Sequence, residues 1–222
     1  MNLGTYRART RTWYVILPAL LILVLLLSAC GGKSKDNNMN GMSGMGGNST
    51  QAASAAPFDQ QFIDMMVPHH MSAVEMAKIA QTRGEHPEIK TLAGNIIADQ
   101  NKEIGQMQQW RKAWFGSDQT PAMDQMPMLP GLPASDMKNM SANGTMNMMT
   151  DINTLKTATP FDKAFITAMI PHHQSAIDAA KLAKDKGEHQ EIKTLAGNII
   201  TSQQKEIDQM QQWLKAWYGS TP

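Results

Sequence analysis

FDQQFIDMMVPHHMSAVEMAKIA, residues 58–80, recurs as FDKAFITAMIPHHQSAIDAAKLA at residues 161–183. The offset of 103 residues, from His69 to His172, also carries His86 onto His189, so all six histidines of the chain belong to one internal repeat. Histidine is retained mainly for metal binding, proton transfer and pH sensing. Two adjacent histidines inside an apolar helical stripe, present twice, therefore favour a metal site over a hydrogen-bonded core role.

Apolar and small residues recur every three or four positions in each copy, as expected of one helical face. Pro68 lies inside the first stretch, so we expect the helix either to bend near residues 65–68 or to be divided there. The segment Arg83-Gly84-Glu85-His86-Pro87 has the glycine-then-proline order of a break between two helices. The pattern predicts four long helices, over residues 58–82, 88–114, 161–186 and 190–217.

Each pair of helices predicts an antiparallel hairpin with one apolar side. A hairpin of about 60 residues would not bury a sufficient core alone, whereas two hairpins can cover each other. The predicted fold class is therefore all-α, a four-helix bundle made by internal duplication. The expected organisation is a signal peptide (1–29), a tether rich in Met, Gly and Asn (30–56), a first hairpin (57–116), a linker rich in Met and Pro (117–159) and a second hairpin (160–222).

The N-terminal segment contains basic residues first, then a run of apolar residues and then small residues. Arg7, Arg9 and Arg11 precede an apolar run over residues 13–27, which ends in Leu-Ser-Ala-Cys. This order is typical of a secretory signal, and the run is short for a membrane span of about 20 residues. The ending resembles the lipobox of bacterial lipoproteins, which implies cleavage before Cys30 and its lipidation; an uncleaved anchor helix is the alternative. We expect an extracytoplasmic protein held at the membrane through Cys30.

Composition limits the chemistry and the partners. Cys30 is the only cysteine, so the chain can form neither an intramolecular disulfide nor a thiolate cage, and soft ligands must come from its 19 methionines. The formal charge is +1, and removal of residues 1–29, with three arginines and no acid, gives 1 − 3 = −2. Such a balance gives no reason to expect nucleic acid as a partner. The sequence also lacks a nucleophile elbow, a phosphate loop or a paired acid dyad, so we expect no small-molecule substrate and no catalytic residue.

The repeated polar residues predict a pocket in each hairpin. Met66 precedes His69 and His70 by three and four positions, so the three side chains can point into one pocket. In an antiparallel hairpin that turns near residues 84 and 85, Glu103 lies level with Met66 and supplies a carboxylate. The second copy keeps the corresponding residues, Met169, His172, His173 and Glu206.

Nitrogen and sulfur ligands in one pocket point to copper. Imidazole suits copper, zinc, iron and nickel, whereas thioether selects Cu(I). A site that mixes Met with His can hold both Cu(I) and Cu(II), so copper is the predicted ion and zinc the second choice. The predicted metal ligands are Met66, His69, His70, Met169, His172 and His173.

Further candidate ligands each have a second interpretation. Glu103 and Glu206 lie beside the pockets, Met107 and Met210 are suited to core packing, and His86 and His189 stand at helix starts, where a capping or surface role is the default. Met39, Met42 and Met45, spaced by three in the tether, can wrap a soft cation or reflect composition alone.

Asp59 and Asp162 are expected to cap or complement the helices that they begin. The paired tryptophans are expected to pack at the bundle ends, where an indole face over a cation is the alternative; they are Trp110, Trp114, Trp213 and Trp217.

The motif Phe58-Asp59-x-x-Phe62-Ile63-x-x-Met66-x-Pro68-His69-His70, followed by a helix ending Gln-Met-x-x-Trp, resembles the bacterial family known as domain of unknown function 305. The resemblance covers residues 57–116 and 160–219, as two tandem copies. It implies a ferritin-like four-helix architecture, export from the cytoplasm and, for some members, copper binding through Met and His with a role in copper resistance. The ligands carried over by position are the same six residues. No di-iron chemistry is implied, because such sites need Glu-x-x-His motifs and the sequence has none.

Three functions remain open from the sequence. The first is a non-enzymatic, membrane-anchored copper-binding lipoprotein that sequesters copper or hands it to a copper transporter or oxidase. The second is a metal-dependent redox enzyme that oxidises Cu(I) or reacts with peroxide. The third is a structural or docking bundle whose histidines bond internally and bind no metal.

Overall fold

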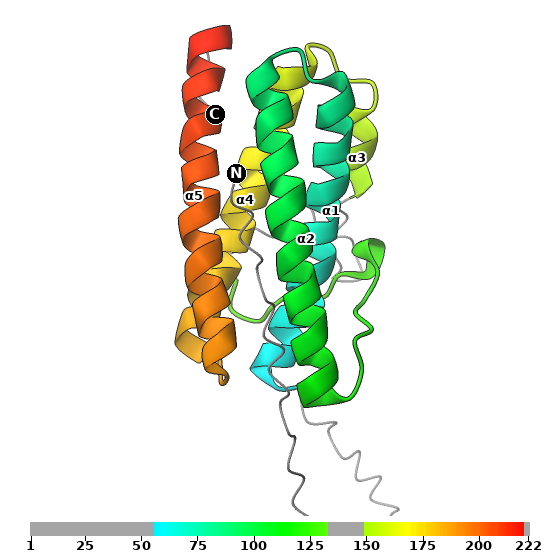
Figure 1. Ribbon diagram of the computed structural model, residues 1–222, viewed down its shortest axis with the longest axis vertical. Helices are drawn as coiled ribbons and strands as arrows, with labels where there is room; N and C mark the ends of the chain where they lie inside the picture. The colour runs from blue at the N-terminus through cyan, green and yellow to red at the C-terminus, as the bar shows by residue number, and fades with distance from the viewer. Residues whose placement is uncertain (1–55, 133–148, 220–222) are drawn as a thin grey trace, which may run out of the picture. The chain divides into compact units, whose positions relative to one another are not determined.

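The computed structural model describes residues 56–132 and 149–219. The predicted signal peptide, Cys30 and the tether methionines lie outside these residues. In the described part, four long helices are joined by two short ones, with the bounds α1 Phe58–Arg83, α2 Pro87–Phe115, η1 Met123–Gln125, α3 Met149–Leu155, α4 Phe161–Lys186 and α5 Gln190–Tyr218 (Figure 1). The prediction of an all-α fold built from two helical hairpins is confirmed.

The two hairpins meet through their first helices. Helix α1 packs on α2 and α4 packs on α5, while α1 and α4 contact each other. Figure 1 shows that α1 and α4 run in opposite directions. Their midpoints therefore lie at one level, and the start of each first helix lies near the turn of the other hairpin.

The apolar core consists of two clusters, and each cluster contains residues of both hairpins. One cluster joins Phe62 and Met66 of α1 to Ala180 of α4 and Leu195 of α5. The other joins the matching parts of the second copy, including Phe165, Met169 and Met210, to Ala77 and Leu92 of the first. Each hairpin therefore buries its apolar side against the other, as the short length of a single hairpin requires.

Helix α1 runs unbroken through Pro68, so the alternative of a helix divided near residues 65–68 was wrong. The break occurs at Gly84, where a Cβ atom would lie 2.7 Å from the carbonyl oxygen of Ala80. Only glycine allows this close approach. Pro87 then starts α2 at a position where its missing N–H costs nothing.

The region between the hairpins contains the two short helices that the sequence did not predict. Ile152 and Leu155 of α3 are buried against the second core cluster. The Arg83 guanidinium donates to the backbone oxygens of Leu155 and Ala158, which fixes α3 to the end of α1. Among the described helices, none has an apolar stretch long enough to cross a bilayer.

Candidate metal centre

The four central histidines meet where α1 crosses α4. The rings of His69 and His172 lie 3.9 Å apart between centroids, with 43° between their planes. His70 and His173 flank them at 6.2 and 6.3 Å from their neighbours in sequence. All four side chains are buried. The two hairpins thus place their histidine pairs at the same level, which the sequence left open.

We call His69 and His172 the inner histidines, and His70 and His173 the outer histidines. Two serines determine which ring nitrogen of each inner histidine carries the proton. Ser175 Oγ lies 2.8 Å from His69 Nε2, and Ser72 Oγ lies 2.7 Å from His172 Nε2. Each serine hydroxyl donates its own hydrogen to a backbone oxygen, Ser72 to His69 and Ser175 to His172. The serine oxygens must therefore accept from the rings. Both inner histidines carry a hydrogen on Nε2, and their Nδ1 atoms keep a lone pair.

Two carboxylates accept a hydrogen bond from the Nε2 atoms of the outer histidines, as the serines do from the inner ones. Glu103 Oε2 lies 2.7 Å from His70 Nε2, and Glu206 Oε2 lies 2.7 Å from His173 Nε2. An ionised carboxylate only accepts hydrogen bonds, so each ring donates from Nε2. The sequence placed Glu103 level with Met66 on the facing helix, and in the structure it binds His70, one turn further along α1.

The environment favours neutral imidazoles at the two inner positions. Burial lowers the pKa of His69 well below its usual value, and the neighbouring histidines lower that pKa further. The pKa of His172 is lowered in the same way, first by burial and then by His173 and His70. A neutral imidazole is the form that binds a metal ion.

Six buried side-chain atoms of histidines and glutamines in the described part of the chain have no hydrogen-bond partner. They are the Nδ1 atoms of the four central histidines and the Oε1 atoms of Gln100 and Gln203. Buried polar atoms are rarely left unpaired, and each such atom calls for an explanation. A bound cation or a buried water would satisfy these atoms.

The predicted thioether ligands are also buried. Met66 and Met169 have no exposed surface and lie in the two core clusters, one turn from the histidines along α1 and α4. Met107 and Met210 are equally buried, as expected of core packing. Within the described residues, no three side chains of His, Cys, Asp or Glu are grouped as a metal site requires.

The two remaining histidines belong to clusters at the hairpin turns, far from the centre. Asp162, at the start of α4, accepts from the backbone N–H groups of Glu85 and His86 at 2.9 and 2.8 Å. Its Oδ2 atom also lies 2.7 Å from His86 Nδ1. Asp162 lies in the first turn of α4, where it complements the helix dipole as expected, but it makes no cap hydrogen bond to that helix. Antiparallel packing brings it instead to the unpaired N–H groups before α2.

The second turn repeats the arrangement. Asp59 accepts from the N–H groups of Glu188 and His189 and lies 2.7 Å from His189 Nδ1. Trp114 stacks on His189 with ring centroids 3.7 Å apart, and Trp217 stacks on His86 at 3.8 Å. The turn of each hairpin is therefore held by an aspartate and a tryptophan, both from the other hairpin.

A family model for DUF305, a domain of unknown function, matches residues 59–214. The chain belongs to the DUF305 family. The match runs through both hairpins as one span, so it does not resolve them as two copies of the family domain. A curated relative, the uncharacterized protein L153 of Acanthamoeba polyphaga mimivirus, is 43% identical over 49 residues, which cover 22% of this chain and 32% of that relative.

Solved structures share the fold of this DUF305 chain over almost their whole length. CopM in the Cu(I)-bound form is 40% identical, with 72% of this chain and 98% of CopM covered and a TM-score of 0.58. CopM in the Cu(II)-bound form is 43% identical, with 72% and 97% covered and a TM-score of 0.59. A DUF305 protein of Streptomyces coelicolor that is inferred to be secreted is 25% identical, with 74% and 96% covered and a TM-score of 0.59.

The sequence did not single out two residues of this DUF305 centre, Ser72 and Ser175. A signal for them was present, because both copies keep serine three positions after the first histidine. Position three along a helix shares a face with the starting residue. The serine therefore had to lie on the same apolar face as the histidine, where a hydroxyl needs a partner.

Proposed function

We propose that this DUF305 protein is an extracytoplasmic, membrane-anchored copper-binding lipoprotein. It sequesters copper, or hands it to a copper transporter or oxidase, and so serves copper homeostasis or resistance. The observation that carries the proposal is the buried centre of unpaired acceptor atoms, four of them imidazole nitrogens. Similarity to CopM structures with bound Cu(I) and Cu(II) supports it.

The donor set of this chain fits copper better than zinc. Structural zinc is held almost always by four ligands in a tetrahedron, and the described residues offer no group of three His, Cys, Asp or Glu. Cu(I) accepts two or three ligands and favours nitrogen and thioether sulfur. The Nδ1 atoms of the four histidines, with Met66 and Met169 one helical turn away, offer both kinds of atom.

The surrounding residues prepare the imidazoles for this role. Ser72, Ser175, Glu103 and Glu206 occupy every Nε2 atom and so leave Nδ1 as the free nitrogen of each ring. Partners of this kind orient a ligand and raise its basicity. Burial of the rings excludes bulk water from the nitrogens. These features suit retention of an ion, and we assign no catalytic residue.

The site assignment is tested by replacing His69, His70, His172 and His173 together by Ala in the mature protein without Cys30. Cu(I) affinity is measured by competition with a chelator, and Cu(II) affinity by titration calorimetry. We expect tight binding to be lost, by more than about a hundredfold, since even residues outside the coordination sphere contribute 10–100-fold. The matched control replaces His86 and His189 by Gln and should bind copper as the parent does.

Equal copper affinity in the quadruple variant would defeat the assignment. If that variant does not fold, as judged by circular dichroism, the outer pair alone is replaced by Gln at His70 and His173, which keeps a polar group at each position. A buried water in place of the cation is the competing explanation for the unpaired atoms. It predicts that copper leaves the NMR signals of the four rings unshifted.

The membrane anchor rests on the Leu-Ser-Ala-Cys ending of the signal. Replacement of Cys30 by Ala in cells should move the protein from the membrane fraction to the soluble fraction and abolish incorporation of labelled fatty acid. A variant that stays in the membrane would instead support the uncleaved anchor helix.

A further inference from the structure

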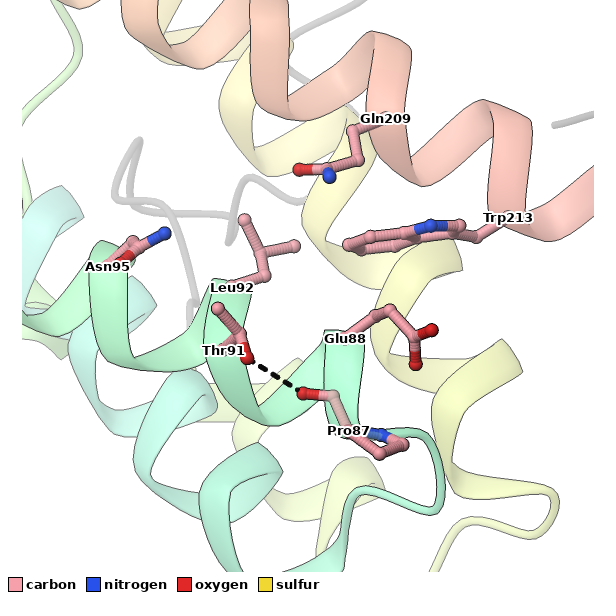
Figure 2. A pocket seen from close by; sticks show the side chains of 7 residues that line it. All are labelled: Pro87, Glu88, Thr91, Leu92, Asn95, Gln209 and Trp213. Atoms are coloured by element: carbon pink, nitrogen blue, oxygen red, sulfur yellow. Dashed lines mark hydrogen bonds between the residues drawn. The ribbon is translucent and has the colours of Figure 1, made fainter.

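Two equivalent grooves lie between α2 and α5, away from the histidine centre. The first has a volume of about 300 Å³, and its lining includes Glu88, Thr91, Leu92 and Asn95 of α2 with Gln209 and Trp213 of α5 (Figure 2). The second has a volume of about 350 Å³ and is lined by the same positions of the opposite copies: Glu191, Thr194, Leu195, Asn198, Gln106 and Trp110. The internal repeat therefore builds the same recess twice.

The six residue types are identical in the two grooves although several of them are exposed. Glu88, Thr91 and Asn95 are exposed and have no packing role that would preserve them. Among exposed positions outside the grooves, some have diverged between the copies, such as Asp99 and Ser202, and some are kept, such as Lys102 and Lys205. Each groove therefore offers the same exposed polar groups to a ligand.

The tryptophan of each groove is held in place by a stack of rings. Trp213 stacks on Trp217 with centroids 5.3 Å apart, and Trp217 lies flat on His86 at 3.8 Å. His86 is fixed in turn by the buried carboxylate of Asp162. A ligand that lies on Trp213 therefore finds a preformed flat surface and orders little of the protein on binding.

The groove carries one negative charge, and its two side-chain amides supply both donors and acceptors. Glu88 is the only charged side chain among the lining residues, and in the described part of the chain it has no hydrogen-bond or ion-pair partner. The Thr91 hydroxyl donates to the backbone oxygen of Pro87, which leaves its lone pairs to accept (Figure 2). The indole face of Trp213 also attracts positive charge. The groove thus suits a flat cation that carries several N–H groups.

We propose that each groove binds the guanidinium group of an arginine side chain presented by a partner polypeptide. Guanidinium is planar, carries five N–H donors, stacks on aromatic rings and pairs with carboxylates. An ammonium group has a compact, more strongly hydrated charge and fewer donors. A neutral sugar could stack on the same ring, but it would leave the Glu88 charge without a partner. The two grooves allow one partner with two arginines to bind bivalently.

The test uses N-acetyl-arginine amide as the probe on metal-free protein, which separates it from copper binding. Indole N–H signals of the five-tryptophan chain are assigned by NMR and followed during titration. We expect the Trp110 and Trp213 signals to shift together at millimolar probe. Replacement of Glu88 and Glu191 by Gln should weaken binding roughly fivefold. Replacement of exposed Asp99 and Asp208 by Asn removes the same charge outside the grooves and should leave binding unchanged.

Three parallel probes decide the chemistry. N-acetyl-citrulline amide has the shape of the arginine probe without its charge, and N-acetyl-lysine amide has the charge without the plane; both should bind more weakly. The third probe is the neutral sugar chitobiose. Shifts with the citrulline probe as large as those with the arginine probe, or larger shifts with chitobiose, would overturn the proposal. Absence of any shift with the arginine probe would overturn it as well.

Discussion

The central and the turn histidines use opposite ring nitrogens. At the centre, Nε2 is occupied by serine or glutamate, the ring is buried and Nδ1 has no partner. At the turns, Nδ1 is occupied by a buried aspartate, and a tryptophan covers one ring face. All six histidines recur at one offset in the sequence, so repetition alone does not separate them. The contacts of each ring separate four histidines whose Nδ1 atoms have no partner from two that join the hairpins.

The largest expected effect is a loss of stability when the aspartates that hold the hairpin turns are replaced. Replacement of Asp59 or Asp162 by Ala leaves two backbone N–H groups and a ring N–H without their acceptor. Each change should lower the free energy of unfolding by about 3 kcal/mol, since unpaired buried groups are costly. Denaturation in urea measures this. The two sites share no contacts, so their effects should add.

Copper binding should be retained in both aspartate variants as long as they remain folded. Replacement of exposed Asp99 by Ala is the matched control and should change stability by less than about 0.5 kcal/mol. A similar small change at Asp59 would mean that the turn clusters do not hold the hairpins together.

The second effect is a loss of stability in acid that comes from the centre. The pKa values of His69 and His172 are lowered in the folded protein, so below pH ~6.5 the unfolded chain binds protons that the folded protein does not. Their contribution is therefore constant above this pH and falls as the pH decreases. Each ring should cost up to about 1.4 kcal/mol per pH unit until its lowered pKa is reached.

Unfolding by urea between pH 7 and pH 5 measures this slope in metal-free protein. Replacement of His69 and His172 by Gln should flatten it, whereas the same replacement of His86 and His189 should leave the central contribution intact. An unchanged slope in the first variant would show that these rings titrate normally and are not the neutral ligands inferred here.

The third effect concerns the carboxylates behind the outer histidines. Replacement of Glu103 and Glu206 by Gln keeps the size of the side chain but removes the charge that fixes the proton on Nε2. Copper affinity should fall about 10–100-fold, the usual value of such partners. Chelator competition measures it, with replacement of exposed Glu75 by Gln as the control. Unaltered affinity would mean that these pairs only join the helices of each hairpin.

Local patterns predicted the helices and their boundaries to within a residue or two. The apolar spacing, Gly84 and Pro87 are local signals, and each acts through neighbours in sequence. Helix α3 escaped prediction because its seven residues carry too little periodicity. The grouping of Met66, His69 and His70 was also predictable, because they share a helix face whatever the second hairpin does.

Contacts between the hairpins could not be predicted from such signals. The connection between the copies is long enough to allow either orientation of the second hairpin. Only antiparallel crossing of α1 and α4 brings Asp59 to His189 and Ser72 to His172. These contacts join residues 100 or more positions apart, and no local spacing encodes them. The assignment of histidines to centre or turn therefore required the structure.

The smallest effect should come from the methionines, and it sharpens the comparison between ligand and core packing. Replacement of Met66 and Met169 by Leu removes two thioethers at nearly constant volume, so stability should change by less than about 1.5 kcal/mol per site. If sulfur takes part in the site, Cu(I) affinity should fall several-fold while Zn(II) binding is unaffected, because only the soft ion prefers thioether. Replacement of the equally buried Met107 and Met210 by Leu is the control, and chelator competition with both ions is the measurement. Equal Cu(I) affinity in the two pairs of variants would show that the imidazoles hold copper without sulfur and that all four methionines serve packing.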